Sequence, residues 1–273
     1  MSSLVSVAIA CGAIASACWL LSLITKEYSW VDRLWSIVPI GYVAWFAYAA
    51  GFSPRLTIMS ALALAWGVRL TFNFARKGGY AKGGEDYRWA ELRTRMSPLA
   101  FQAFNFAFIA AFQNALLLAI TLPAWRASQH PETPLGVLDV VATCLFVILL
   151  IGETIADEQQ WRFQNEKKAR RERGEPLTEP FLRTGLFRYS RHPNFFCEIS
   201  IWWTFGLFTI ASGASIVDWT WIGAIVLTAL FQGSTNFTEE LSLRKYPSYA
   251  AYQRATSRLI PWFPRRAASP GAP

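Results

Sequence analysis

The stretch "GLFRYSRHPNFFCEISIWW", residues 185–203, changes within a few positions from cationic and hydrogen-bonding side chains to a strongly apolar segment. Arg188, Arg191 and His192 lie in its first half, and Glu198 stands just inside the apolar half. A helix rises about 1.5 Å per residue, so about twenty apolar residues cross the hydrocarbon core of a bilayer. The stretch therefore predicts polar groups gathered at the entrance of a membrane helix.

The whole chain has the composition of a membrane protein. Of its 273 residues 53% are hydrophobic and 16% are charged, and 13 are tryptophans, which is too apolar and aromatic for a typical soluble domain. Its net charge of +8 is compatible with nucleic acid, anionic lipid or an anionic cofactor as a partner. The four cysteines lie in apolar segments without CxxC spacing and are predicted to be small buried apolar residues: Cys11, Cys18, Cys144 and Cys197.

Seven apolar windows predict an all-α membrane protein with seven transmembrane helices. The windows cover residues 4–25, 34–51, 56–75, 101–122, 136–156, 195–212 and 219–237. The first window has no basic leader and no small-residue cleavage site, so it is predicted to be a retained span. We expect one domain over residues 1–264, followed by a disordered tail at 265–273.

The basic residues give an independent prediction of topology, because Lys and Arg of short loops concentrate on the cytoplasmic side. Of the 26 basic residues, 23 lie in regions that seven helices place on one side: Lys26 with Arg33, 76–100, 157–193 and the segment after 238. This predicts an outer N-terminus and a cytoplasmic C-terminus, in the inner membrane of a bacterium. The alternation also argues against nucleic-acid binding, which needs a contiguous basic stripe.

Polar side chains recur near the cytoplasmic ends of the predicted spans, where they are costly unless they face partners or water. Three sets share a helix face by their spacing, and two further pairs lie at similar depth: Glu153, Asp157 and Gln160; Gln232, Asn236 and Glu239; Asn194 and Glu198; Asp32 and Arg33; Arg69 and Asn73. These sets predict a polar chamber that opens to the cytoplasm and is lined by cations. Interfacial snorkelling with interhelical hydrogen bonds is the alternative.

A cationic chamber suits a phosphate-bearing, nucleotide-like cofactor, because Arg binds phosphate through two parallel hydrogen bonds. The chain has no GxGxxG, GxxxxGK[ST] or HExxH motif, so a soluble-type dinucleotide fold, a P-loop and a zinc hydrolase are disfavoured. Only His130 and His192 are available for acid–base chemistry by histidine. Tyr87 and Tyr80 can donate a proton to a substrate carbonyl, with an interfacial aromatic anchor as the alternative role for either.

Four stretches together resemble the steroid 5-alpha-reductase family, and most closely its bacterial branch. They are "GLFRYSRHPNFFCE" with the following "WW", "LRKYPSYAAYQRATSRLIPWFP", "DRLWS" at 32–36 and "GGYAKGGEDYRWAELR" at 78–93. Members of this family are seven-helix membrane enzymes that use NADPH to reduce a carbon–carbon double bond conjugated to a ketone. The resemblance thus implies an NADPH-dependent oxidoreductase of steroid or lipid metabolism.

The resemblance also implies roles for individual residues. Asn194 and Glu198 match the family motif N-[FY]-x-G-E, in which Cys197 here replaces the glycine. Tyr87 is the implied proton donor to the ketone, with Tyr80 as the alternative, and Asp32 and Glu198 complete the implied catalytic set. The implied cofactor contacts are Asp157, Gln160, Arg170, Arg171, Arg183, Tyr189, Arg191, His192, Asn194, Asn236 and Glu239.

The implied reaction transfers hydride to the beta carbon of a 3-oxo-4-ene steroid or a similar enone lipid that enters from the bilayer. An S-adenosylmethionine-dependent isoprenylcysteine or phospholipid-type methyltransferase is the alternative. Its signature shares "RHP" and paired acids such as Glu239 and Glu240 ahead of a Tyr-, Arg- and Pro-containing tail. Asn194 and Glu198 in one motif favour the reductase. A non-enzymatic lipid-binding protein is the third interpretation.

Overall fold

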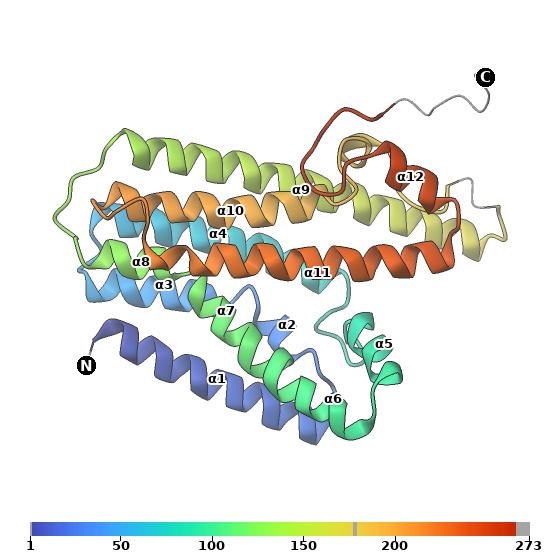
Figure 1. The fold of residues 1–273 in the computed structure, drawn as a ribbon, viewed down its shortest axis with the longest axis horizontal. Coiled ribbons are helices and arrows are strands. Elements are labelled where there is room, and N and C mark those ends of the chain that lie inside the picture. The colour runs from blue at the N-terminus through green and yellow to red at the C-terminus, as the bar shows by residue number, and fades with distance from the viewer. Residues whose placement is uncertain (1, 177–178, 266–273) are drawn as a thin grey trace. The chain divides into compact units, whose positions relative to one another are not determined.

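The computed structural model describes residues 2–176 and 179–265, and every regular element in them is a helix (Figure 1). This confirms the all-α class. The predicted tail, apart from Arg265, lies outside the described residues. The chain divides into two compact units: an N-terminal unit of residues 1–146 with 202–227, and a C-terminal unit of residues 147–201 with 228–273. Three long helices carry residues of both units: α9 (Val137–Glu172), α10 (Pro193–Ala211) and α11 (Ile222–Lys245).

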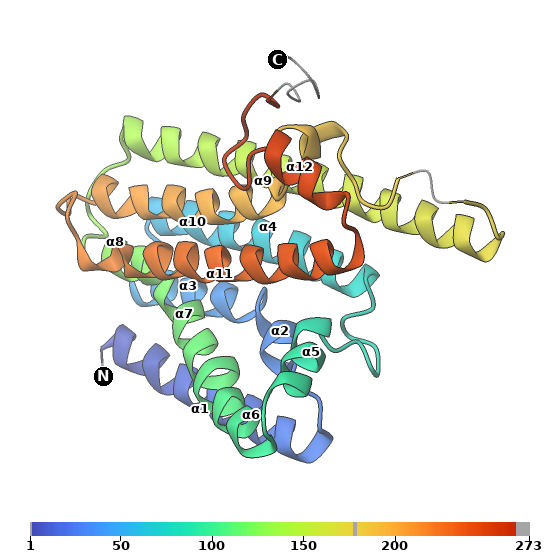
Figure 2. The same ribbon diagram turned by 45° about the vertical axis from the view of Figure 1, so that its right-hand side comes forward.

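The N-terminal unit is built from short and long apolar helices. Its elements are α1 (Ser3–Thr25), α2 (Trp30–Leu34), α3 (Val38–Ala49), α4 (Pro54–Arg76), α5 (Tyr87–Arg95), α6 (Pro98–Phe104), the π-helix η1 (Asn105–Phe112), α7 (Gln113–Ala119), α8 (Leu122–Ser128) and the 3-10 helix η3 (Trp219–Trp221). Helix α1 lies beside η1 and α7, and α3 packs on α4 and α8 (Figures 1 and 2). The seven predicted windows all fall on helical segments.

Four of the described helical segments are long and apolar enough to cross a membrane: Ser3–Thr25, Pro54–Arg76, Pro98–Ser128 and Val137–Glu172. Helix α3 is apolar but shorter, because the predicted span 34–51 is broken between α2 and α3. Polar side chains such as Glu198 in α10 and Gln232 in α11 lower the hydropathy of those helices. The chain therefore has several helices that can span a membrane, while seven spans and their orientation stay predictions.

The π-helix η1 interrupts the segment that the sequence predicts as one α-helix over 101–122. In the wider turns of a π-helix, side chains four residues apart can stack on one another. The ring of Phe108 stacks on those of Phe104 and Phe112, with distances of 4.9 and 5.2 Å between ring centroids. Asn105 begins the element and donates to Ser22 Oγ of α1 at 2.8 Å, so the irregular segment is tied to its neighbour.

A buried ion pair joins α4 to the first turn of α9 in the N-terminal unit. Arg55 donates from Nε and Nη2 to the two carboxylate oxygens of Asp139 at 2.7 and 3.0 Å, and both residues are almost fully buried. Arg55 also donates to the carbonyl oxygens of Thr133 and Pro134. Each of the three guanidinium nitrogens thus has at least one acceptor, as a buried charge requires.

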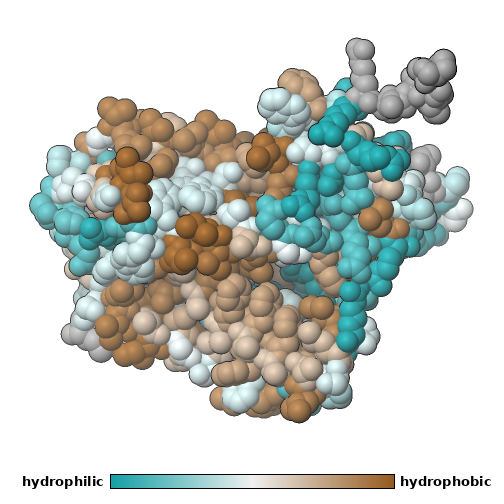
Figure 3. Space-filling model, viewed as in Figure 1, coloured by the Kyte–Doolittle hydropathy of each residue, from teal (hydrophilic) through white to brown (hydrophobic). Residues whose placement is uncertain are grey.

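The C-terminal unit holds the polar end of α9, the start of α10, the second half of α11, the 3-10 helix η2 (Gly185–Arg188) and α12 (Tyr249–Ala255). Its helices approach closely where Cys197 of α10 meets α9. A Cβ atom on Gly152 would lie 3.2 Å from Cys197 Sγ, so a glycine on α9 makes room for the cysteine that replaces the motif glycine. Figure 3 shows hydrophilic residues gathered over α12 and the end of α11.

Candidate functional site

Glu239 of α11 is the centre of a buried polar network in the C-terminal unit. Its carboxylate accepts from Arg191 Nε at 2.7 Å and Nη2 at 3.1 Å, from His192 Nε2 at 3.0 Å and from Gln253 Nε2 at 2.7 Å. The side chains of Arg191 and Glu239 are only 9% and 8% exposed. Burial alone would raise the pKa of Glu239, but the hydrogen bonds from His192, Arg191 and Gln253 lower it to about 2. Glu239 is therefore a fixed anion.

Backbone hydrogen bonds fasten the final loop, residues 256–265, to the segment that precedes α10. Arg191 N donates to Ser257 O at 2.8 Å, and His192 N donates to Arg258 O at 3.2 Å. Ser190 Oγ donates to Leu259 O at 2.7 Å. The "YSRHP" segment of the opening stretch is thus the anchor on which the end of the chain folds.

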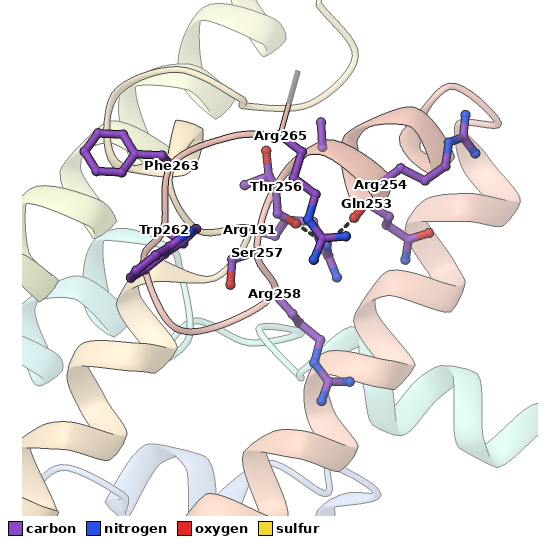
Figure 4. A pocket seen from close by; sticks show the side chains of 10 residues that line it. Arg191, Gln253, Arg254, Thr256, Ser257, Arg258, Trp262, Phe263 and Arg265 are labelled. Carbon is purple, nitrogen blue, oxygen red and sulfur yellow. Dashed lines mark hydrogen bonds between the residues drawn. The ribbon is translucent and has the colours of Figure 1, made fainter. Parts of the chain in front are cut away.

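A cavity of about 390 Å³ lies between this loop, α12 and Arg191 (Figure 4). Its wall is formed by Arg191, Gln253, Arg254, Ala255, Thr256, Ser257, Arg258, Trp262, Phe263 and Arg265. Four of these ten residues are arginines and none carries a carboxylate. Arg191 is neutralised by Glu239, whereas Arg254, Arg258 and Arg265 leave the wall cationic. Such a wall can bind phosphate or carboxylate, and Trp262 offers a ring for stacking.

The structure brings several of the predicted cofactor residues together within the C-terminal unit. Arg191, His192 and Glu239 share the buried network. Asn194 Nδ2 donates to Asp157 Oδ1 at 3.4 Å, which links α10 to α9. Glu198 is buried one turn after Asn194 on the same helix.

The other predicted cofactor residues lie away from that network. Asn236 accepts a hydrogen bond from Arg258 at the cavity wall. The ring of Tyr189 meets Phe263 edge to face at 6.0 Å between centroids. Arg170 pairs with Glu166, and Arg183 pairs with Glu179, in each case four residues earlier in the chain. Gln160 is half-buried on α9, and Arg171 is exposed on the same helix.

The predicted catalytic residues of the N-terminal unit surround the loop before α5. Trp89 Nε1 donates to Asp32 Oδ2 at 2.7 Å. Partial burial and the neighbouring Asp86 raise the pKa of Asp32, whereas Arg88 and the hydrogen bonds from Trp89 and Ser29 lower it, with a net rise. The Asp32 carboxyl therefore takes up a proton at a higher pH than an ordinary aspartate.

The two tyrosine candidates differ in their surroundings. Tyr80 donates its hydroxyl to Arg33 O at 3.0 Å, so it has a structural partner. Tyr87 is the first residue of α5 and its side chain is 57% exposed. Two contacts hold the loop that carries Tyr80. Arg33 Nε donates to Gly79 O, and Gly84 lies so close to Gly78 that a Cβ atom on Gly84 would be 2.1 Å from Gly78 O. A side chain on Gly84 would therefore clash with the backbone of Gly78.

Sequence reasoning missed most of the cavity wall. The predicted site residues do not include Gln253, Arg254, Arg258 and Trp262, although the four lie in a stretch that carries the family resemblance. The available signal is the grouping of four arginines with Trp262 and Phe263 within the fourteen residues "QRATSRLIPWFPRR". Arginine forks can bind phosphate, and aromatic rings can stack on a flat ligand or a cation.

The fold and the cavity define a helical membrane protein with a cationic, aromatic-lined site next to a buried carboxylate network. Within that class the chain belongs to the family DUF1295, a protein family of unknown function, whose profile matches residues 18–256. The chain is 38% identical over 261 residues to an uncharacterized protein of Schizosaccharomyces pombe. The alignment covers 89% of this chain and 75% of the relative. No solved structure shows significant similarity.

Proposed function

We propose that the protein is an NADPH-dependent membrane oxidoreductase that reduces the carbon–carbon double bond of an enone lipid. The family is associated with steroid 5-alpha-reductase-like proteins, in agreement with the sequence resemblance. The observation that carries the proposal is the arginine-lined cavity backed by the Glu239 network. An anionic nucleotide needs such a cationic wall, and a steroid-sized substrate suits a protein with lipid-exposed helices.

The residues present fit a phosphorylated dinucleotide. Arg254, Arg258 and Arg265 supply guanidinium groups for phosphate oxygens, and Trp262 supplies a stacking face for a ring. The hydrogen bonds of Arg191 to Glu239, Gln253 O and Thr256 O keep the inner wall in one geometry. A wall that is ordered before binding avoids the entropy cost of fixing long side chains.

Bound NADPH would supply the hydride. Negative charge then grows on the ketone oxygen of the enone, and a hydrogen-bond donor that is already in place stabilises it better than water does. From the family resemblance we assign this donor role to Tyr87, the first residue of α5, and an orienting role to Asp32 or Glu198. Loss of such a donor typically raises the barrier by about 2.7 to 4 kcal/mol. The natural substrate class is a 3-oxo-4-ene steroid or another lipid with the same conjugated ketone.

Ligand-induced thermal stabilisation tests the cofactor assignment. NADPH at one hundred times its dissociation constant should stabilise the folded protein by about 2.7 kcal/mol, whereas S-adenosylmethionine should have no effect. The opposite result would establish the methyltransferase alternative. Arg258→Gln should weaken NADPH binding, and Arg162→Gln is the matched control, because Arg162 is an exposed α9 residue paired with Glu158 outside the cavity.

Turnover is tested separately. Purified protein with NADPH and a 4-ene-3-one steroid should lose nicotinamide absorbance. NADPH stabilisation without oxidation of any enone lipid offered would retain the cofactor assignment and reject the reductase activity. Failure of both ligands to stabilise the protein would reject both enzymatic functions.

A further inference from the structure

The C-terminal unit exposes a continuous apolar run at the turn of its final loop. Ile260 is 67% exposed, Trp262 is 70% exposed and Phe263 is 77% exposed, and Pro261 between them is exposed as well. We name residues 260–263 the apolar tip. Single exposed apolar residues are common on protein surfaces, but a run of four with two aromatic rings marks an interaction surface.

The tip is held in its exposed position by the fold. Trp262 N donates to Tyr189 O at 2.9 Å, and Arg265 N donates to Ala255 O at 2.8 Å on the other side of the turn. The ring of Phe263 rests edge-on against Tyr189 and points away from the arginines of the cavity (Figure 4). The loop thus presents Trp262 and Phe263 outward while its backbone is fixed at both ends.

Contacts within the C-terminal unit place the tip near the polar end of α9. Ile148, Ile151 and Ile155 form an exposed apolar stripe at helical spacing on that helix. Gln159 lies one turn beyond the stripe, about 6 Å along the axis, and its Oε1 accepts from Leu186 N at 2.9 Å. Tyr189 lies three residues after Leu186, and it contacts the tip through the hydrogen bond from Trp262 N and the ring of Phe263.

This position is the depth at which α9 changes from apolar to polar side chains. After Ile155, the last residue of the stripe, and Ala156, four polar residues follow without interruption: Asp157, Glu158, Gln159 and Gln160. In a helix that can cross a membrane, such a change marks the boundary between acyl chains and headgroups. Tryptophan and other amphipathic rings concentrate at that boundary. The tip therefore has both the composition and the depth of an interfacial element.

The charges beside the tip favour anionic lipid over another protein chain. Arg188 is exposed next to Tyr189, and Arg265, which also lines the cavity, is exposed two residues after the tip. Each arginine near an anionic membrane surface contributes about 1 kcal/mol of attraction. A second copy of this chain is a poor occupant, because its net charge of +8 and the same arginines would repel.

We infer that the apolar tip inserts into the headgroup region of the membrane and that Arg188 binds an anionic phospholipid headgroup beside it. The inference does not rest on the proposed reductase activity, although Trp262 is also the ring of the proposed cofactor site. It has one structural consequence: Trp262 also lines the cavity, so the membrane surface fixes one wall of that cavity.

Fluorescence quenching in lipid nanodiscs tests the insertion. The difference between wild type and Trp262→Phe isolates the emission of Trp262, and the replacement keeps an aromatic ring in the tip. We expect lipids brominated near the headgroup end of the acyl chain to quench this difference signal strongly, and aqueous acrylamide to quench it weakly. Trp45→Phe is the control, because its difference signal reports a half-exposed tryptophan that lies on the apolar helix α3 and not in the tip.

Quenching of Trp262 by acrylamide but not by brominated lipid would overturn the inference, since the tip would then lie in water. Protection from both quenchers would overturn it as well, because another protein surface would cover the tip. The charge arm compares phosphatidylglycerol with phosphatidylcholine nanodiscs. Anionic lipid should increase quenching of Trp262 by brominated chains in wild type, and Arg188→Gln should reduce that increase. An equal increase in the variant would remove Arg188 from the lipid contact.

Discussion

Replacement of Glu239 by Gln should destabilise the C-terminal unit strongly and in a pH-dependent way. The substitution removes the charge that neutralises Arg191 while it keeps the shape of the side chain. Breaking a buried ion pair from one side typically costs about 3 to 5 kcal/mol, because the remaining charge stays buried and unpaired. At about 2 to 4 °C per kcal/mol for a chain of this size, the melting temperature should fall by roughly 6 to 20 °C.

The pKa of Glu239 gives a second estimate of the same contribution. It lies at about 2 in the folded chain against an ordinary value of 4.5, a difference worth about 3 kcal/mol. Because the folded-state pKa is the lower one, the ionised carboxylate stabilises the fold above pH 4.5. This contribution is lost as the pH falls toward 2. The difference between wild type and Glu239→Gln should therefore be large at pH 6 and should shrink steadily below pH 4.5.

Thermal unfolding in detergent, followed by tryptophan fluorescence between pH 3 and pH 7, measures this difference. Glu240→Gln is the matched control, because the neighbouring Glu240 is 51% exposed and pairs with Arg244 at 3.7 Å on the surface of α11. An exposed pair of this kind contributes about 0 to 1 kcal/mol. A loss for Glu239→Gln that is as small as in the control, or that does not change with pH, would refute the buried network as a source of stability.

Three further predictions concern the N-terminal unit. Asp139→Asn should destabilise the protein by about 3 to 5 kcal/mol by leaving Arg55 buried without its counterion, and the melting temperature measures this loss. Trp89→Phe removes a hydrogen bond that lowers the pKa of Asp32, so the acid limb of the pH–activity profile should move to higher pH. Tyr87→Phe should abolish enone reduction while thermal stabilisation by NADPH persists; retained turnover would exclude Tyr87 as the donor.

Hydropathy predicted where helices lie better than where they end. The window ending at 156 corresponds to α9, which continues to Glu172. Its polar extension carries ion pairs four residues apart, including Arg162 with Glu158 and Arg170 with Glu166, and these support a helix outside any apolar window. The π-helix η1 has no comparable signal, because an apolar run of alanine and phenylalanine is compatible with either winding.

Part of the candidate site was predictable from residue type and spacing. Glu239 is predicted from its spacing with Gln232 and Asn236 at the end of a span, and Arg191 and His192 are predicted from the polar half of the opening stretch and the family resemblance. The structure joins the three residues in one network. The cavity wall was not predictable in the same way. The loop that carries Arg258 and Trp262 has no periodic pattern, and its path is set by backbone hydrogen bonds to residues 189–192 that side-chain patterns do not encode.

The Arg55–Asp139 pair can form only after both residues have been synthesised. The two residues are 84 positions apart, so at about 5 to 20 residues per second the ribosome adds Asp139 roughly 4 to 17 seconds after Arg55. During that interval the guanidinium has no counterion from α9. Arg55 is the second residue of α4 and Asp139 lies in the first turn of α9, so each charge can wait in water at a helix end. The pair can therefore close only after the start of α9 has been synthesised.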